Sequence, residues 1–595
     1  MYRSENARKT FAELGRTYTY SELTRTVDQL GGLFDQFGLR IGDRVVVSSE
    51  HPFILSSLVL AGLRYGITTV LVDPETGPQR AQDLFQTTRP RAYFVDESLR
   101  LKWALQAHVF SWQPQESSKG TLFQKMLGQK KDTRPSERFF DKLSAFSATP
   151  PPTRIDPETI GYILFTSGTT ATSKAVQISH RAILANLQTT QSVYQLADNS
   201  RIYNILTLYH TDGLFQGPIL TAFSGGSWYR PLTFAVDQIP QVFDGMYKYR
   251  ITHFITVPTM LAFMQQFAKG YEDSFQHPDF QFISCSAAPL DQHVWTTFEA
   301  TFQTTIVNVY GLTETVNIAT VSGPEAPSRK VGTIGKPVDC VCRLVDPEGR
   351  DVPIGAQGEI LIQGATLFSG YCNDDDANEA AFTDGWFRTG DLAVQDQDGF
   401  YTLVGRKKNL VISGGINIQP EEVAQVLATH PDIREAACIG QPDPVFGEKL
   451  VAAVVLHTGA IPDESSLINH CRQELELTKV PRAIIFVDYL PRTASGKVHI
   501  PELRSLLQND QLAKGGDLTD VRSGLLACAA EAFNTSVDDL DLNRSAENLE
   551  GWDSMAHLIF VTNLEKHFAV RFSSKDVMVM SSLQEALAIL QKKLG

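Results

Sequence analysis

The sequence lacks the features of secreted, membrane-spanning and nucleic-acid-binding proteins. Only 7 of its 595 residues are cysteines, and because no two form a CxxC pair we expect reduced thiols rather than a disulfide framework or a zinc site. Lys and Arg total 53 against 67 Asp and Glu, so the net charge of −14 leaves no basic surplus for nucleic acid or an anionic membrane. The N-terminus has no signal-peptide core, and Arg64 interrupts the apolar stretch 53–72. We therefore expect a soluble, cytoplasmic protein with no nucleic-acid or membrane partner.

Alternating helix and strand patterns predict an α/β fold. At 21–38 a Ser at the N-cap position precedes one apolar helical stripe, formed by Leu23, Val27, Leu30, Leu33 and Phe34. The segment 43–49 then has the pattern of a buried strand, and alternation of this kind predicts much parallel sheet. The span 112–158 is rich in Pro, Ser, Lys and Gln, and we interpret it as an excursion outside the core.

Composition divides the chain into successive parts. A large first part spans 1–404, ending in β-rich segments, and a smaller α+β unit spans 405–505. The polar segment 506–518, which contains a Gly-Gly pair, is typical of a flexible linker. The last part, 519–595, has the pattern of an all-helical domain with an acidic loop between two amphipathic helices.

The segment TSGTTATSKAV (166–176) has the composition of a phosphate-binding loop. It follows the apolar strand-like run 160–165, and its small hydroxyl residues around Gly168 allow backbone N–H and side-chain O–H groups to surround phosphate oxygens. Lys174 adds a positive charge. The GxxxxGK[ST] pattern of ordinary P-loop proteins is absent. Taken alone, the segment leaves a Ser/Thr-rich surface turn as an equal alternative.

Further motifs follow along the chain in a fixed order: CSAAPL at 285–290, NVYGLTET at 308–315, WFRTGDL at 386–392, GRKKNLVISGGINIQPEE at 405–422 and LPRTASGK at 490–497. Together with the loop, they resemble the acyl-adenylate-forming superfamily of acyl-CoA synthetases, luciferases and peptide-synthetase adenylation domains, over about residues 15–505. The resemblance implies that 1–404 is a large adenylation lobe with parallel and mixed sheets and a small β-barrel-like part. It implies that 405–505 is a smaller, mobile α+β lobe, with a hinge at Lys408.

The resemblance also implies a reaction and its cofactors. A carboxylic acid and Mg-ATP would give an acyl-adenylate and pyrophosphate, after which a thiol displaces AMP. Because a carboxylate must approach a charged phosphate, such a site needs cations and oriented donors rather than a strong base. No metal beyond Mg²⁺ is implied, since the 13 histidines show no paired ligand spacing.

Nucleotide-binding roles are carried over from the resemblance. The phosphate loop would consist of Thr166, Ser167, Gly168, Thr169, Thr170 and Lys174. Tyr310 would stack on adenine, in a base pocket with Ala287, Ala288, Pro289, Asn308 and Gly311. If the motifs did not occur in this shared order, an ordinary structural role without nucleotide binding would explain each of these residues.

The remaining polar roles concern charge. Thr313 would contact the α-phosphate and Glu314 would hold Mg²⁺. Asp391 would accept from the ribose hydroxyls, with Arg406 nearby, and Lys497 would neutralise the carboxylate and the α-phosphate. The alternatives are a turn-forming Asp391, a solvated Lys497 and a Glu314 that caps a helix start.

Three residues in the loop depart from the family pattern TSGTTGxPKG. Ala171, Ser173 and Ala175 stand where Gly, Pro and Gly are usual. Alanine is strained wherever glycine adopts positive φ, so loop motion or pyrophosphate binding is expected to change. A non-catalytic carrier and docking protein is therefore one alternative function.

The C-terminal segment 547–568 resembles the modified helix of acyl and peptidyl carrier domains. Ser554 follows Asp553 at the start of an amphipathic helix, where Ser is also a common N-cap without further function. The resemblance implies a four-helix carrier domain with 4′-phosphopantetheine on Ser554. A phosphopantetheinyl transferase and downstream synthase or tailoring enzymes of a natural-product pathway would then be partners. Loading in cis is expected, and transfer to free CoA is the alternative.

The segment 206–226 resembles the acid-pocket helix of acyl- and aryl-CoA ligases. His210 would gate the pocket, with Asp212 and Gly213 beside it. The FDxS-type Asp that holds an amino-acid ammonium is not found, so a fatty or aromatic acid is favoured over an α-amino acid. Asp212 is an alternative partner for an ammonium group, or else a helix-start cap.

Overall fold

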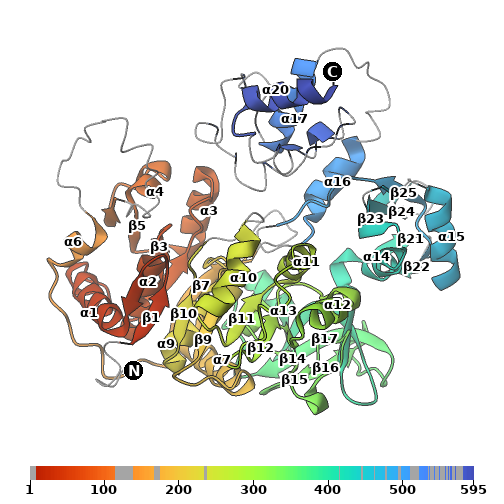
Figure 1. Cartoon of the computed structure of the whole chain (residues 1–595). Coiled ribbons are helices and arrows are strands. Elements are labelled where there is room, and N and C mark those ends of the chain that lie inside the picture. Colours follow the sequence, from red (N-terminus) through yellow and green to blue (C-terminus); the bar gives the residue numbers. More distant parts are fainter. Residues whose placement is uncertain are drawn as a thin grey trace. The chain divides into compact units, whose positions relative to one another are not determined.

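The computed structural model, whose helices and strands Figure 1 labels, divides into two compact units. Residues are described over 9–113, 138–166, 174–232, 238–413, 416–443, 447–457, 459–460, 463–475, 479–493, 497–509, 521–533 and 580–594, with separate positions between 535 and 576. The first unit runs to Lys408, apart from 235–238, and includes Thr493–Lys497. The second runs from Asn409 to Arg492 and from Val498 onward.

A six-stranded sheet forms the N-terminal part of the first unit, with the strand order β6-β5-β3-β4-β7-β8. Its strands are β3 (Arg44–Ser48), β4 (Thr68–Leu71), β5 (Ala92–Asp96), β6 (Val109–Trp112), β7 (Ile160–Phe165) and β8 (Ala175–Ser179). Neighbouring strands are parallel except β7 and β8, which are antiparallel. The helices of this part are α1 (Tyr20–Gln36), α2 (Pro52–Tyr65), α3 (Pro78–Thr88), α4 (Glu97–Lys102), α6 (Phe139–Leu143) and α7 (His180–Val193).

A nine-stranded sheet holds the centre of the unit, in the order β15-β14-β13-β12-β11-β9-β10-β1-β2. Its strands are β1 (Thr10–Glu13), β2 (Thr17–Thr19), β9 (Arg201–Asn204), β10 (Ser227–Tyr229), β11 (His253–Thr256), β12 (Phe282–Cys285), β13 (Ile306–Tyr310), β14 (Thr320–Ser322) and β15 (Lys336–Pro337). The run from β13 to β1 is parallel. Two mainly parallel sheets confirm the predicted α/β fold.

Short helices connect the strands of the nine-stranded sheet. They are α8 (Thr211–Leu214), η2 (Phe215–Ile219), α9 (Leu220–Ser224), α10 (Ile239–Lys248), α11 (Pro258–Gln266), α12 (Gln292–Phe302), η4 (Thr313–Thr315) and η5 (Ala326–Ser328). Pro218 lies inside η2, and Gly217 beside it has non-helical φ and ψ. The loss of a helical N–H at proline explains a kink at this point.

A third, antiparallel sheet completes the unit and occupies the predicted β-barrel-like part. It pairs β16 (Cys340–Val345), β17 (Gln357–Gly364), β18 (Phe382–Thr383), β19 (Trp386–Gln395) and β20 (Tyr401–Arg406). The described pairings run β16-β17-β19-β18, with β20 on β19. The helices α13 (Asp375–Ala381) and η6 (Lys407–Asn409) flank it in the chain.

The second unit contains a small sheet and several helices. Its strands are β21 (Val411–Ser413), β22 (Ile416–Ile418), β23 (Ile433–Asp443), β24 (Gly447–Leu456) and β25 (Ala483–Phe486), and its helices are α14 (Pro420–Ala428), α15 (Glu464–Glu474), α16 (Ile500–Asn509), α17 (Val521–Ala532) and α20 (Leu583–Leu594). Apolar residues from α17, α20 and the described positions between them form a separate hydrophobic core. Among the described residues, no helix is long and apolar enough to cross a membrane.

Two local expectations are corrected. The first helix begins at Tyr20 with Thr19 as its N-cap, because Thr19 and Glu22 form a reciprocal capping box, so the Ser at position 21 is not the cap. The span 112–158 also contributes to the core. Trp112 and Phe139 are fully buried with ring centroids 4.9 Å apart, which the polar composition around them concealed.

Candidate functional site

Several predicted residues meet at the carboxyl edge of the nine-stranded sheet. Because β9, β12 and β13 are parallel, the segments that follow them lie at the same edge. Ala287–Pro289 follow β12, while Asn308 and Tyr310 belong to the end of β13. Asn308 donates from Nδ2 to the Thr333 carbonyl at 2.9 Å, and Ala287 has a φ of 72°. A left-handed alanine is uncommon and is a typical feature of functional turns.

The buried carboxylate of Asp391 contacts two other predicted nucleotide-binding residues. Tyr310 donates from Oη to Oδ2 of Asp391 at 2.8 Å, and Arg406 Nε lies 2.6 Å from Oδ1. Asp391 and Arg406 are direct partners across β19 and β20, which explains how the pair is held. Burial and the Asp391 charge raise the pKa of Tyr310 well above its usual value. Asp391 belongs to a strand, so the alternative of a turn-forming Asp is wrong.

A second contact links the predicted magnesium ligand to the phosphate loop. Glu314 is buried in η4, and Tyr371 donates from Oη to its Oε1 at 2.9 Å. Lys174 Nζ lies 4.3 Å from the centre of the Tyr371 ring, within the range of a cation–π contact. Sequence reasoning missed Tyr371, which carries no motif of its own and reaches β8 through a bridge to Val176.

The base of the phosphate loop is described, while the predicted residues Ser167, Gly168, Thr169 and Thr170 lie outside the described residues. Thr166 N–H donates to the Lys174 carbonyl at 3.1 Å, so these two residues close the loop at the end of the β7–β8 hairpin. Ala175 is the first residue of β8, where the extended backbone accepts any side chain. The expected strain at Ala175 is therefore wrong. Ala171 and Ser173 lie outside the described residues.

The predicted acid-pocket residues begin α8. His210 makes no capping bond with its side chain, and burial lowers its pKa despite the charges of Asp212 and Asp73, with Lys497 lowering it further. Asp212 accepts from Ser286 Oγ at 2.5 Å and from Gln216 Nε2 at 3.1 Å, so it is not the helix cap of the alternative interpretation. At Gly213, a Cβ atom would lie 2.0 Å from the Thr207 carbonyl oxygen. Only glycine fits there.

Lys497 lies in the first unit, within reach of these charges. Its loop is closed by the Thr493 N–H, which donates to the Lys497 carbonyl at 2.7 Å. Surrounding protein and the charge of Arg406 lower the pKa of Lys497, while Asp212, Asp391 and Glu314 act in the opposite direction. Its side chain keeps contact with solvent, so an entering ligand can reach it. The structure thus brings Lys497, Arg406, Asp391 and Glu314 into one electrostatic neighbourhood.

Two other predicted residues are less fully described. The backbone of Lys408 belongs to η6, at the end of the first unit, and its hinge role stays a prediction. Ser554 lies outside the described residues. No cluster of three or more metal-ligating side chains occurs in the part of the chain that the structure describes.

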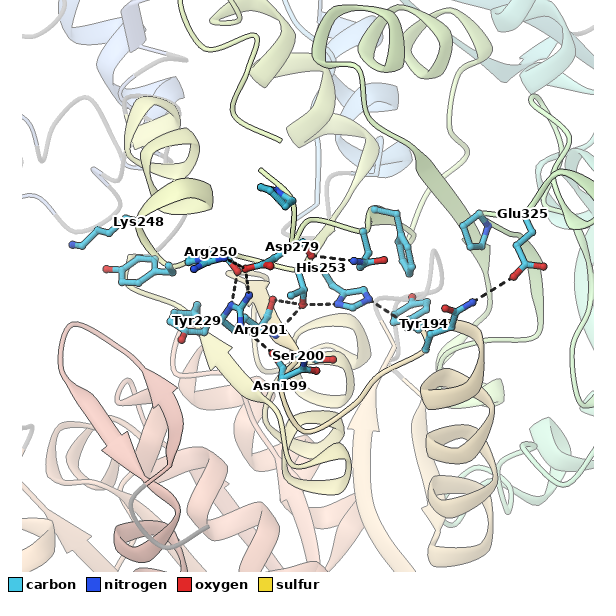
Figure 2. Close-up of a pocket in the computed structure, with 17 residues that line it drawn as sticks. Tyr194, Asn199, Ser200, Arg201, Tyr229, Lys248, Arg250, His253, Asp279 and Glu325 are labelled. Carbon is cyan, nitrogen blue, oxygen red and sulfur yellow. Dashed lines mark hydrogen bonds and ion pairs between the residues drawn. The ribbon is translucent and has the colours of Figure 1, made fainter. Parts of the chain in front are cut away.

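A separate cavity of about 870 Å³ lies at the amino edge of the same sheet, where β9, β11 and β12 begin (Figure 2). Three of its charged side chains form an ion-pair cluster. Asp279 Oδ2 lies 2.7 Å from Arg201 Nη2 and 2.8 Å from Arg250 Nη2. None of the predicted site residues lines this cavity, which is opposite to the edge that carries them.

Comparison with protein families gives two matches. The family model described as AMP-binding enzyme matches residues 3–372, and the model of the AMP-binding enzyme C-terminal domain matches residues 422–497. Residues beyond 497 lie outside both.

Individual relatives give a consistent result. The chain is similar to sulfoacetate–CoA ligase of Cupriavidus necator, with 31% identity over 81% of this chain and 91% of the relative. It is 28% identical to a long-chain-fatty-acid–CoA ligase of Escherichia coli, over 83% of this chain and 91% of that protein. The structure of ATP-bound MatB from Rhodopseudomonas palustris superposes with a TM-score of 0.75 at 27% identity, covering 85% of this chain and 97% of MatB.

Proposed function

Because the chain belongs to the AMP-binding enzyme family of AMP-forming acid–thiol ligases, we propose that it activates a carboxylic acid with Mg-ATP and transfers the acyl group to coenzyme A. In the first step a carboxylate oxygen attacks the α-phosphorus, and the bond to pyrophosphate breaks. In the second step the CoA sulfur attacks the acyl carbon, AMP leaves and the thiol proton is released. The acceptor is assigned to CoA because the curated relatives are named as CoA ligases.

The cluster around Asp391 is the observation that carries this proposal. A buried carboxylate fixed by Tyr310 and Arg406 presents acceptor oxygens suited to ribose hydroxyls, next to a ring suited to stacking on a base. Lys497 and Arg406 supply cations in the same neighbourhood, where a carboxylate and a phosphate must approach each other. Lys497 would therefore stabilise the charge that develops at the α-phosphate while the bond to the carboxylate oxygen forms and the bond to pyrophosphate breaks.

The residues around Glu314 fit Mg²⁺. The ion prefers one or two carboxylates together with phosphate oxygens, and Glu314 offers a buried carboxylate that Tyr371 holds by one oxygen only among the described residues. Magnesium would neutralise the charge of the ATP phosphates. Thr166 and Lys174, at the base of the phosphate loop, would orient the pyrophosphate leaving group.

The experiment measures AMP and acyl-CoA formation from a pool of carboxylic acids, ATP, Mg²⁺ and CoA. We expect AMP to form only when acid is present, and a thioester to form only when CoA is also present. Lys497→Ala should remove both products, while Lys248→Ala, a lysine at the end of α10, should retain them. ATP cleavage that is independent of acid would contradict the proposal.

A second candidate acceptor is a phosphopantetheine thiol on Ser554. The support is the separate hydrophobic core formed by residues of 521–594, which lie beyond the family models. A carrier domain at this position would deliver its thiol at high effective concentration. The acyl group would then be passed to natural-product enzymes downstream.

Intact mass separates the two acceptors. After treatment with a phosphopantetheinyl transferase, Mg-ATP and acids, a carrier gains the cofactor and then an acyl increment, and Ser554→Ala gains neither. If the protein gains no mass while acyl-CoA accumulates, CoA is the acceptor and the carrier interpretation is wrong. A protein that gains phosphopantetheine on Ser554 but no acyl increment, and that cleaves no ATP with any acid, would support the alternative of a non-catalytic carrier and docking protein.

The identity of the acid rests on the segment around His210. Its resemblance to acyl- and aryl-CoA ligases favours a fatty or aromatic acid, while Asp212 is the feature that favours an amino group on that acid.

A further inference from the structure

The segment that leads to His210 is tied to two different sheets. At its start, Asn204 at the end of β9 accepts the Leu206 N–H through Oδ1 at 3.0 Å, which fixes the chain to the nine-stranded sheet. At its tip, Tyr209 reaches the six-stranded sheet, where its Oη accepts from the Ser49 N–H and donates to the Ser49 carbonyl oxygen, both at 2.9 Å. His210 therefore lies one residue after a contact between two sheets.

Ser49 is itself held by a buried carboxylate. Asp96, the last residue of β5, is 1% exposed and accepts from Ser49 Oγ through Oδ1 at 3.1 Å and from the Glu50 N–H through Oδ2 at 2.7 Å. The same Ser49 Oγ accepts from the His51 N–H at 3.1 Å. A buried carboxylate is costly unless hydrogen bonds satisfy it, so these donors and Asp96 fix one another. Tyr209 thus contacts a turn that is held in one position.

The strand order explains why this turn carries a contact. β3 lies between β5 and β4, and the chain leaves β3 toward β4 but leaves β5 toward β6. Adjacent parallel strands whose connections run in opposite directions form a crevice at their carboxyl ends, which is a common place for ligand sites in α/β folds. Ser49 and Asp96 stand at the carboxyl ends of β3 and β5, and the Tyr209 hydroxyl binds between the sheets at this point.

His210 depends on this contact for its position. Among the described residues, no hydrogen bond or ion pair holds its side chain, so the backbone decides where the ring lies. Burial lowers the pKa of His210, the charges of Asp212 and Asp73 act in the opposite direction, and Lys497 lowers it further. Asp73 follows β4 of the six-stranded sheet, whereas Asp212 follows β9 of the nine-stranded sheet. The ring of His210 therefore lies where the carboxyl edges of both sheets approach the proposed adenylation site.

We propose that Tyr209 is a positioning residue for the acid pocket, and that its contact with Ser49 sets the place of His210 and thereby the affinity for the acid. The proposal rests on the proposed function, because it concerns how that site holds its acid. Tyr209 touches neither the acid nor ATP and acts through His210. The residues assigned to the nucleotide belong to other elements, so loss of the contact weakens acid binding and leaves ATP binding unchanged.

The test is Tyr209→Phe in the full-length protein, because this change keeps the ring and removes only the hydroxyl. ATP–pyrophosphate exchange is measured with hexanoate, phenylpropionate and phenylalanine as the acids, each over a range of acid and ATP concentrations. We expect the KM for the acid to rise about tenfold, because two buried backbone groups each lose a hydrogen bond, while the KM for ATP changes less than about twofold. Ser49→Ala keeps the backbone bonds to Tyr209 and should raise the KM for the acid by a smaller factor.

A double-mutant cycle tests whether Tyr209 acts through His210. His210→Ala should raise the KM for the acid by itself, and adding Tyr209→Phe should raise it no further, because the residue that Tyr209 positions is already absent. A contact that only supported the fold would lower activity by the same factor in both backgrounds. Tyr162→Phe is the matched control. Tyr162 is a fully buried residue of β7 in the same sheet, its hydroxyl has no partner among the described residues, and its loss should leave the KM for the acid unchanged.

The outcomes separate this role from the proposed function. If Tyr209→Phe exchanges pyrophosphate with an unchanged KM for the acid, or with equal rises in the KM for acid and for ATP, the positioning role is wrong and adenylation stands. A full effect of Tyr209→Phe in the His210→Ala background also overturns the role. If Tyr209→Phe is unfolded by circular dichroism, the same comparison of KM values in Ser49→Ala and Tyr162→Phe decides. A wild type that gives no exchange with any acid contradicts the proposed function, and the role of Tyr209 with it.

Discussion

Tyr310 and Asp391 lie 81 positions apart in the chain and share a buried hydrogen bond of 2.8 Å. The bond fixes the tilt of the aromatic ring relative to the carboxylate, so base stacking and ribose binding depend on the same contact. Arg406, paired with Asp391 across β19 and β20, compensates the buried charge. The three side chains therefore act as one unit.

Tyr310→Phe should weaken ATP binding while leaving the fold intact. The variant keeps the ring but removes the donor to Asp391, and a hydrogen bond to a charged group contributes about 1.5–3 kcal/mol. We expect the KM for ATP to rise about tenfold, measured by ATP–pyrophosphate exchange. Asp391→Asn should cost more, because it leaves Arg406 without its charge partner. Tyr247→Phe, at an exposed tyrosine, is the matched control. An unchanged KM for ATP in Tyr310→Phe would show that the three side chains do not act as one unit in ATP binding.

The contact between Tyr371 and Glu314 predicts a change in magnesium dependence. Tyr371→Phe frees Glu314 Oε1 from its hydrogen bond but keeps the ring below Lys174. We expect the Mg²⁺ concentration for half-maximal activity to change severalfold, because the carboxylate is no longer oriented. Tyr371→Leu also removes the cation–π contact with Lys174, and this variant should in addition have a lower kcat than Tyr371→Phe. Equal Mg²⁺ curves for the wild type and Tyr371→Phe would exclude a link between Tyr371 and the metal.

The site shows which parts of a protein can be predicted from its sequence. The strand at 160–165 and the apolar stripe of the first helix follow from periodicity, and the structure has both. Tyr371 was missed because it reaches Glu314, 57 positions away, only through tertiary structure. The same holds for the core role of Trp112 and Phe139, in a segment whose average composition is polar. Motifs can be identified from the residues of a short segment, whereas contacts between distant segments depend on the fold.

Asp212 and Ala175 illustrate a different limit. The sequence allowed Asp212 to be a helix cap, and only its bonds to Ser286 and Gln216 exclude that role. Ala175 was expected to be strained by comparison with a family glycine, but its position in β8 requires no positive φ. Alanine in place of a motif glycine therefore strains the backbone only where that position has a positive φ.

Buried His253 predicts acid sensitivity of the folded state. Burial lowers its pKa to about 4, so the folded protein binds its proton less readily than the unfolded chain does. The stability from this residue is present above pH 6.5 and is lost as the pH falls toward 4. At pH 5 the loss is about 2 kcal/mol. His253→Asn should show a smaller fall in Tm between pH 7 and pH 5. An identical pH dependence in both proteins would contradict this contribution.

The lowered pKa of Lys497 predicts a basic limb in the pH profile of adenylation. The ammonium form is the one that neutralises charge at the α-phosphate, and it is lost as the pH rises through a pKa below the usual lysine range. The charged groups that act on Lys497 in the described structure are Arg406, Asp212, Asp391 and Glu314, with His210 nearby. We therefore expect the exchange rate to fall at high pH.

Lys497→Arg is the matched test of this limb. A guanidinium group stays protonated throughout the accessible range, so the variant should be slower at neutral pH but should keep its rate as the pH rises. Arg406→Lys should retain a basic limb, because Lys497 is still present. The profile is measured as ATP–pyrophosphate exchange at saturating acid and Mg-ATP. If the wild type and Lys497→Arg decline together at high pH, the titrating group is not Lys497, and its charge does not limit the reaction.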